Sequence, residues 1–144
     1  MIWLLRHGDA EDEAPDDASR QLTEKGRRQA RAAGAALKRL GVNVDACLTS
    51  PKLRARDTAI VACAELGVKP EEDEALRGGD FDPAKLAAGR GEVMLVGHEP
   101  DFSRAIAAAT GARVKLKKGG LAAIDDSTLV ELLRPAELRA IAGR

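Results

Sequence analysis

The sequence predicts an α/β protein, a three-layer α/β/α sandwich built around a mostly parallel central sheet. Three short apolar runs, at residues 1–5, 42–49 and 92–96, each end in polar residues and lead toward a segment of helical periodicity. Runs of this length without alternation are typical of strands buried on both faces of a parallel sheet. Because strands and helices alternate, we expect helices to cover both faces of that sheet.

Composition indicates one domain, residues 1–144, with an aliphatic core. Of the 144 residues, 44% are apolar, with one Trp, two Phe and no Tyr, and this length suits a single domain. The 23 basic and 23 acidic residues cancel formally, which argues against a nucleic acid or an anionic membrane as partner. No apolar run approaches the roughly 18 residues that span a bilayer. No signal-peptide pattern opens the chain, so we expect a cytoplasmic protein.

An acidic loop and a capped helix should follow the first strand. Six of the nine residues from 9 to 17 are Asp or Glu, and Pro15 interrupts any helix there. We interpret this segment as a solvated loop, or as a charged rim that influences which substrates approach. Thr23 is a natural N-cap for a helix whose apolar residues recur at helical spacing as far as Leu40. Gly41 is expected to end this helix.

The middle of the chain should hold a second helix and a weak edge strand. Ser50 is expected to cap this helix with Pro51 as its first residue, and Gly67 to stop it. Residues 68–76 hold at most an edge strand, because proline cannot donate a hydrogen bond in a central position. Asp82 then caps a short helix.

The C-terminal part should add antiparallel strands to the sheet. A helix is expected over residues 101–110, followed by short strands at 114–117, 121–124 and 129–133. Gly-Gly and Asp-Asp-Ser sequences between them are typical of tight turns. A last helix at about 135–141 completes the predicted architecture.

The two histidines of the chain occupy the same kind of position. His7 comes directly after Arg6 at the end of the first strand, and His98 follows the strand at 92–96. The carboxyl ends of parallel strands meet at one edge of a sheet, where ligands bind. Arg54, in the first turn of the helix after the second strand, should face the same crevice. Two arginines and two imidazoles at one point indicate a phosphate site.

Other sites are disfavoured by spacing. No cluster of Asp, Glu or His has metal-ligand spacing, and no glycine-rich phosphate loop is present, so we expect neither a metal nor another cofactor. Cys47 and Cys63 lie in apolar surroundings and should be inert core residues. Six residues separate Cys47 from Arg54, one too many for the phosphate loop of a cysteine-dependent phosphatase.

Four motifs together resemble the histidine phosphatase superfamily, the phosphoglycerate-mutase-like fold. The small size, the Arg-His-Gly-Asp-Ala start and the acidic loop are most similar to its SixA-like phosphohistidine phosphatases. The resemblance runs from residue 1 to about residue 106. The motifs are Arg6-His7-Gly8, Leu22-Thr23-x-x-Gly26, Ser50-Pro51-x-x-Arg54-Ala55-x-x-Thr58 and Val96-Gly97-His98.

The resemblance implies a role for each site residue. His7 would be the nucleophile and become transiently phosphorylated, while Arg6 and Arg54 would clamp the phosphoryl oxygens. His98 would add a further donor. Arg20 matches a fourth phosphate contact, or is a surface arginine that pairs with the acidic loop. The implied partner is a phosphohistidine-bearing protein of a phosphorelay, or a small phosphorylated substrate, with inorganic phosphate as product.

One departure from the family bears on the substrate. Members that cleave sugar phosphates place an acid shortly after the third strand, where this chain has Gly78 and Gly79; Asp80, Asp82 or Glu99 could substitute. A site without an acid favours phosphohistidine, because imidazole, whose conjugate acid has a pKa near ~6.5, leaves more easily than an alkoxide. The alternatives are a small-molecule phosphomonoester phosphatase that uses one of these acids, and a non-catalytic phosphate-binding domain. The short chain disfavours a mutase.

Overall fold

A mixed six-stranded sheet organises the protein, whose computed structural model describes residues 1–143. The strand order is β3-β2-β4-β1-β5-β6. Neighbours are parallel from β3 to β1, and β5 and β6 are antiparallel to the strands beside them. The expected mostly parallel sheet with an antiparallel addition is therefore confirmed. The strands are β1 Ile2–Arg6, β2 Ala46–Thr49, β3 Pro70–Glu72, β4 Val93–Gly97, β5 Leu121–Asp125 and β6 Thr128–Leu133.

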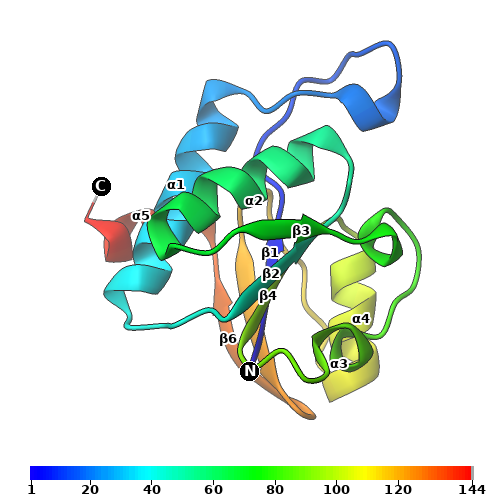
Figure 1. The fold of residues 1–144 in the computed structure, drawn as a ribbon, viewed down its shortest axis with the longest axis vertical. Helices are drawn as coiled ribbons and strands as arrows, with labels where there is room; N and C mark the ends of the chain where they lie inside the picture. Colours follow the sequence, from blue (N-terminus) through cyan, green and yellow to red (C-terminus); the bar gives the residue numbers. More distant parts are fainter. Residues whose placement is uncertain (144) are drawn as a thin grey trace.

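Helices cover both faces of the sheet, as Figure 1 shows. On one face lie α1 (Glu24–Arg39), α2 (Leu53–Leu66) and α5 (Pro135–Ala142). On the other lie α3 (Pro83–Ala87) and α4 (Asp101–Thr110). Two 3₁₀ turns, η1 at Asp17–Ser19 and η2 at Glu74–Leu76, complete the described elements. No helix within residues 1–143 is long and apolar enough to cross a membrane.

The core consists of two apolar clusters that the sheet separates. Successive residues of a strand point to opposite faces, so Leu5 packs with Leu37 of α1 while its neighbour Leu4 packs with Phe102 of α4. All five residues of β4 are buried. Burial on both faces explains why this strand is almost continuously apolar.

Several local signals in the sequence have the expected structural effect. The Thr23 hydroxyl accepts a hydrogen bond from the Gly26 backbone N–H at 3.1 Å and so caps α1. Gly67 ends α2 in the left-handed region, at φ 70°. Pro70 lies in β3 at the edge of the sheet, where its missing N–H is tolerated.

The start of α2 differs from the prediction. This helix begins at Leu53 with Lys52 as its N-cap, so Pro51 is not helical and Ser50 is not the cap. The physical reason lies in the sheet: the Ser50 backbone N–H donates to the Val96 carbonyl at 2.9 Å, which continues the pairing of β2 with β4. The Ser50 hydroxyl still accepts from the Lys52 backbone N–H at 3.2 Å.

Two predicted strands also differ. The strand expected from residue 42 begins only at Ala46, because the Val42 N–H donates back to the Leu37 carbonyl at the end of α1. Residues 114–117 form no strand. Instead, the Leu116 N–H donates to the Glu99 carboxylate and its carbonyl accepts from Arg6, so side chains take the place of a neighbouring strand.

The contact between α1 and α2 depends on Gly34. A Cβ added there would lie 2.4 Å from the Ala62 carbonyl oxygen. Although alanine favours a helix over glycine by about 1 kcal/mol, we expect Gly34→Ala to lower the free energy of unfolding by about 2 kcal/mol, because the clash is with backbone. Urea denaturation measures this loss.

Gly78→Ala is the matched control, since a Cβ there meets nothing within 4 Å. Its free energy of unfolding should change by less than about 0.5 kcal/mol. Equal stability of the two variants would contradict the close packing of α1 on α2.

Candidate active site

The ends of three parallel strands bring the candidate residues together. The His7 backbone N–H donates to the Gly97 carbonyl at 3.0 Å, and the Ser50 N–H donates to the Val96 carbonyl at 2.9 Å. Pairing thus continues one residue beyond β1 and β2, toward the end of β4. His7, Ser50 and His98 consequently follow three adjacent strands at the same edge of the sheet.

A pocket of about 330 Å³ lies at this edge. Six residues that the sequence singled out line it, together with three cations that sequence reasoning did not assign to it. The six are Arg6, His7, Arg20, Arg54, His98 and Glu99, and the three are Lys52, Arg77 and Lys118. The pocket therefore carries a large excess of positive charge, which suits an anion.

His7 is buried and has one ring nitrogen free to react. Its Nδ1 lies 2.7 Å from the Gly8 carbonyl oxygen. A carbonyl only accepts hydrogen bonds, so Nδ1 carries the proton and Nε2 keeps its lone pair. Burial lowers the pKa of His7 to about 4, and the positive charges of Arg54 and Arg6 act in the same direction. The imidazole is therefore neutral near pH 7.

His98 lies beside His7, with the ring centroids 5.3 Å apart. Its Nε2 is 2.8 Å from the Ser50 hydroxyl. Burial, followed by the neighbouring His7 and Arg54, lowers the pKa of His98 to about 3. A phosphate group in the pocket would raise this pKa again, because a nearby negative charge favours the imidazolium.

The two arginines are held through their terminal nitrogens. Arg6 donates from Nη1 to the Leu116 carbonyl at 2.8 Å, and Arg54 donates from Nη1 to the Asp17 carbonyl at 2.8 Å. Within residues 1–143, the buried side-chain polar atoms without a hydrogen-bond partner are Arg6 Nε, Arg54 Nε and His98 Nδ1. Unpaired buried polar groups are costly, so their concentration in one pocket indicates a site for a ligand.

Asp17, at the end of the acidic loop, links three of these cations. Its carboxylate lies 3.1 Å from Lys52 Nζ, 3.2 Å from Arg54 Nη2 and 3.3 Å from Arg20 Nη1. The hydrogen bond from Lys52, followed by those from the two arginines, holds the pKa of Asp17 far below its usual range. The sequence showed the acidic run but gave no signal for this pairing.

Arg20 both pairs with the acidic loop and lines the pocket, the two positions that the sequence left open for it. Its Nε donates to the Glu11 carbonyl at 2.7 Å, so the side chain pairs with the acidic loop. The same side chain lines the pocket, where it is available to a phosphate. Arg56, by contrast, is exposed and lies 3.9 Å from Asp57, outside the lining.

Hydrogen bonds through the Thr58 hydroxyl hold the loop that carries His7. The Gly8 N–H donates to the Thr58 hydroxyl at 3.0 Å, and that hydroxyl donates to the Arg54 carbonyl at 2.7 Å. A Cβ on Gly8 would lie 2.6 Å from the Gly26 carbonyl oxygen. The motifs around His7, Gly26 and Arg54 are therefore in direct contact.

The three acid candidates lie in different places. Asp80 is exposed and lines a separate hollow beside Arg104. Asp82 caps α3 by accepting from the Ala84 N–H at 3.0 Å. Glu99 lines the pocket, but its carboxylate already accepts from the Ser103 N–H at 2.7 Å, the Ser103 hydroxyl and the Leu116 N–H.

Neither a metal cluster nor a reactive thiol is present in the part of the chain that the structure describes. Residues 1–143 contain no group of three or more His, Cys, Asp or Glu side chains placed to hold a metal ion. Cys47 and Cys63 are free thiols in the core, away from the pocket lining. Their mutual contact and burial raise the pKa of Cys47, so this thiol stays protonated.

Known proteins resemble this chain in sequence. The sequence profile of the histidine phosphatase superfamily (branch 1) matches residues 2–88. An uncharacterized protein of Picosynechococcus sp. is 39% identical over 134 residues, which cover 83% of this chain and 81% of that protein. The mitochondrial serine/threonine-protein phosphatase Pgam5 of Drosophila ananassae is 38% identical over 71 residues. These cover 49% of this chain and only 25% of Pgam5.

Solved structures resemble it over nearly the whole chain. The protein histidine phosphatase SixA complexed with tungstate matches with a TM-score of 0.83 and 25% identity, covering 95% of this chain and 98% of SixA. SixA from Agrobacterium tumefaciens matches with a TM-score of 0.78 and 25% identity, covering 93% and 97%. At these coverages the structural match continues beyond residue 88, where the matched profile ends, into the C-terminal part of the chain.

The lowered pKa values of His7 and His98 predict a dependence of stability on pH. The unfolded chain binds protons at both histidines near the ordinary pKa of 6.5, whereas the folded protein does so only near the lower values of about 4 and 3. These groups therefore make the free energy of unfolding fall as pH decreases from about 6.5 to about 4. In urea denaturation, the free energy of unfolding of His98→Asn should fall less steeply than that of the wild type over this range.

NMR titration should place the midpoints of both histidine rings below about pH 5, and a midpoint near 6.5 for either would contradict the burial argument.

Thr58 is expected to act as a positioning residue. Thr58→Val removes the acceptor of the buried Gly8 N–H, which should cost about 1–3 kcal/mol of unfolding free energy. Because His7 precedes Gly8, we also expect kcat to fall by about tenfold, with a smaller change in KM. Thr58→Ser keeps the hydroxyl and should restore kcat. Failure of serine to do so would show that the methyl group, and not the hydrogen bond, is what matters.

Proposed function

The chain belongs to the histidine phosphatase superfamily and is a phosphatase, and we propose that it dephosphorylates phosphohistidine on a protein. The observation that carries this proposal is the pairing of a neutral His7, whose Nε2 is free, with a strongly cationic pocket that neither Asp80 nor Asp82 lines and in which Glu99 is already hydrogen-bonded. The name of the SixA structures supports the same substrate class.

In the first step, His7 Nε2 attacks phosphorus in line with the bond to the leaving imidazole. The new bond joins phosphorus to Nε2, and the phosphorus–nitrogen bond of the substrate breaks. Its electron pair stays on the substrate nitrogen, and the imidazole leaves neutral because its other ring nitrogen carries a proton. The His7 ring keeps its Nδ1 proton, and the positive charge that develops on the ring is stabilised by the Gly8 carbonyl at 2.7 Å. One difficult displacement is thereby divided into two easier ones.

Arg6, Arg54 and His98 bind the three phosphoryl oxygens in this proposal. Both arginines keep a buried Nε–H without a partner, and guanidinium groups suit phosphate oxygens. His98 is neutral before substrate arrives and takes up a proton as the phosphate enters, which makes it a donor in the transition state. Arg20 and Lys52 add charge at the rim.

In the second step, water attacks the phosphorus of phospho-His7 and releases inorganic phosphate. The bond from phosphorus to Nε2 breaks, and the neutral imidazole returns. The same cations stabilise both transition states, because the phosphoryl group stays in place between them. No step in this scheme requires a metal ion, so we propose that turnover is independent of one.

The leaving group favours phosphohistidine over an alkyl phosphomonoester. An alkoxide needs a proton as it departs, and general acid catalysis contributes about 10²- to 10⁴-fold. Asp80 and Asp82 lie outside the pocket lining, and Glu99 already binds backbone and hydroxyl groups. Two acids of the lining keep a small-molecule phosphatase as a second candidate: Glu99, and Asp101 at the start of α4, a residue that sequence reasoning did not single out.

We expect three substrates to separate these functions, with a chelator present throughout. A phosphohistidine-bearing protein should be hydrolysed rapidly, p-nitrophenyl phosphate less well, and glycerol phosphate about 10³-fold more slowly than phosphohistidine, because its alkoxide has no acid. His7→Ala should lower every rate by about 10⁴-fold or more. Arg56→Ala, which changes an exposed arginine outside the pocket, is the control and should keep wild-type rates.

A second measurement detects the intermediate. Acid-labile, base-stable phosphate should be trapped on the wild type during turnover and should be absent from His7→Ala. Rapid hydrolysis of glycerol phosphate that Glu99→Gln or Asp101→Asn abolishes, with phosphohistidine untouched, would replace our proposal by the small-molecule phosphatase. Activity that disappears with the chelator would contradict metal independence.

A further inference from the structure

A second hollow lies directly beside the active-site pocket. This basic groove, of about 640 Å³, runs between residues 115–118, the first turn of α1 and the start of α5. It shares Arg6 and Lys118 with the active-site pocket, so the two hollows adjoin each other. Nothing in the reaction proposed above uses its other residues.

The groove carries an uncompensated positive charge. In the described part of the chain, the lining of the groove contains a single acidic side chain, Asp9, whose carboxylate lies 3.8 Å from Lys118 Nζ. Arg134 is paired with Glu137 at 3.2 Å. Among the described residues, no ion pair joins the other five cations of the lining to an acid; these are Arg6, which the groove shares with the active-site pocket, and Lys25, Lys115, Lys117 and Arg139.

The opposite charge gathers in another hollow, which shares Arg20 with the active-site pocket and no residue with the basic groove. The acidic loop forms its own hollow, lined by Asp12, Glu13, Asp16 and Asp17 together with Arg20. Because the chain as a whole has a formal net charge of zero, this separation is a property of the surface and not of the composition. The active-site pocket therefore adjoins a positive hollow at Arg6 and Lys118 and a negative hollow at Arg20.

Hydrogen bonds connect the groove to the active site. Leu116 lies between Lys115 and Lys117, its carbonyl accepting from Arg6 and its N–H donating to Glu99. Both of those side chains line the active-site pocket. The two exposed lysines are therefore held at a fixed place beside the phosphate site, although nothing in the chemistry requires them there.

We propose that the basic groove binds an acidic surface next to the phosphohistidine of the partner protein. This inference rests on the proposed function, because it assumes that the phosphoryl group is presented on a protein. Exposed lysines on flexible stems suit long-range attraction of an acidic protein surface more than tight enclosure of a small anion. The lining contains no aromatic side chain on which the bases of a nucleic acid could stack.

Matched peptides test the proposal. Two synthetic peptides carry one phosphohistidine each, flanked by glutamates in one and by glutamines in the other. At low salt we expect the wild type to hydrolyse the Glu peptide with a kcat/KM about tenfold higher. Lys115→Glu combined with Lys117→Glu should abolish or invert this preference, and salt near 0.5 M should remove it in the wild type. Hydrolysis of free phosphohistidine should be the same in both proteins.

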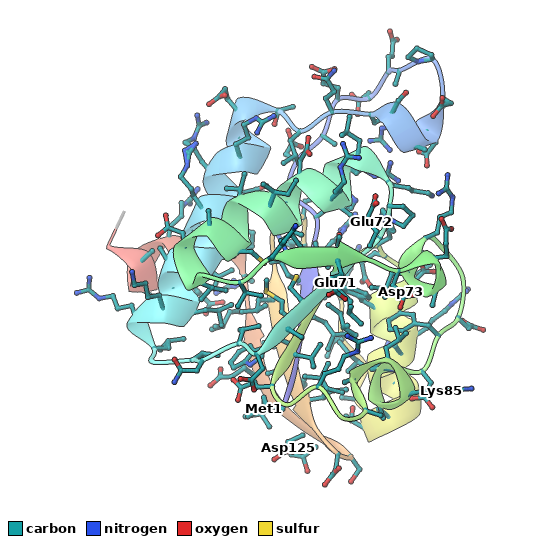
Figure 2. All side chains as sticks on the ribbon, viewed as in Figure 1. Met1, Glu71, Glu72, Asp73, Lys85 and Asp125 are labelled. Atoms are coloured by element: carbon teal, nitrogen blue, oxygen red, sulfur yellow. The ribbon has the colours of Figure 1, made fainter. Side chains whose placement is uncertain are left out.

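Lys85→Glu is the control, because Lys85 is an exposed lysine of α3 toward the Met1 end of the sheet, away from the carboxyl ends of the parallel strands (Figure 2). It should keep the wild-type preference. Equal rates on the two peptides in the wild type, or the same loss in Lys85→Glu, would overturn the proposal.

A binding measurement separates this inference from the proposed function. Fluorescence anisotropy of a labelled, unphosphorylated Glu-rich peptide should report binding to the wild type that the Lys115/Lys117 double variant loses. If that binding is found while neither phosphohistidine peptide is hydrolysed, the substrate proposed above fails and the acidic-peptide site stands. If a short RNA binds through the two lysines and the Glu peptide does not, the proposed partner is wrong.

Discussion

The parallel pairing of β1, β4 and β2 is the constraint on which the site depends. The register sets Arg6 opposite Gly97 and Thr49 opposite Val96. A shift of one residue would turn every side chain of a strand to the other face, and the two apolar clusters on either side of the sheet forbid it. The strand register therefore fixes the polar residues that follow these strands at one edge of the sheet. The buried apolar residues of the strands thus position the catalytic side chains, although they lie several residues away from them.

The pocket contains several polar groups whose burial is energetically unfavourable. Both histidines are held neutral, and each arginine keeps a buried N–H without a partner. Such an arrangement lowers the stability of the empty protein, but a phosphate group can satisfy all of these donors at once. Asp17 offsets part of this destabilisation, since its carboxylate pairs with Lys52 and with Arg54 Nη2, while Arg54 Nε stays without a partner. The acidic loop is thus structurally coupled to the phosphate site.

The sequence predicted those parts of the fold whose signals are local. The Thr23 cap, the Gly67 stop and α4 at residues 101–110 each depend on neighbours within a few positions, and the structure has them as expected. Residues 114–117 were wrongly predicted as a strand, because their backbone partners are the side chains of Arg6 and Glu99. Ser50 likewise follows the sheet and not its capping preference. The histidines could be placed together because they follow strands, whereas Asp17, Lys52 and Lys118 carry no signal until the loops are folded.

The charge distribution separates recognition from reaction. The reacting atoms need only a phosphoryl group and the cations within a few ångströms of it, and these contacts are the same for a free phosphoramidate and for a phosphoprotein. Discrimination among proteins must then come from surfaces outside the pocket. The negative hollow adjoins the pocket at Arg20 and the positive groove adjoins it at Arg6 and Lys118, so together they favour one orientation of a polar partner and disfavour the reverse. Since Arg6 belongs to both the pocket and the groove, a partner held in the groove would also be held against a residue that binds its phosphoryl group.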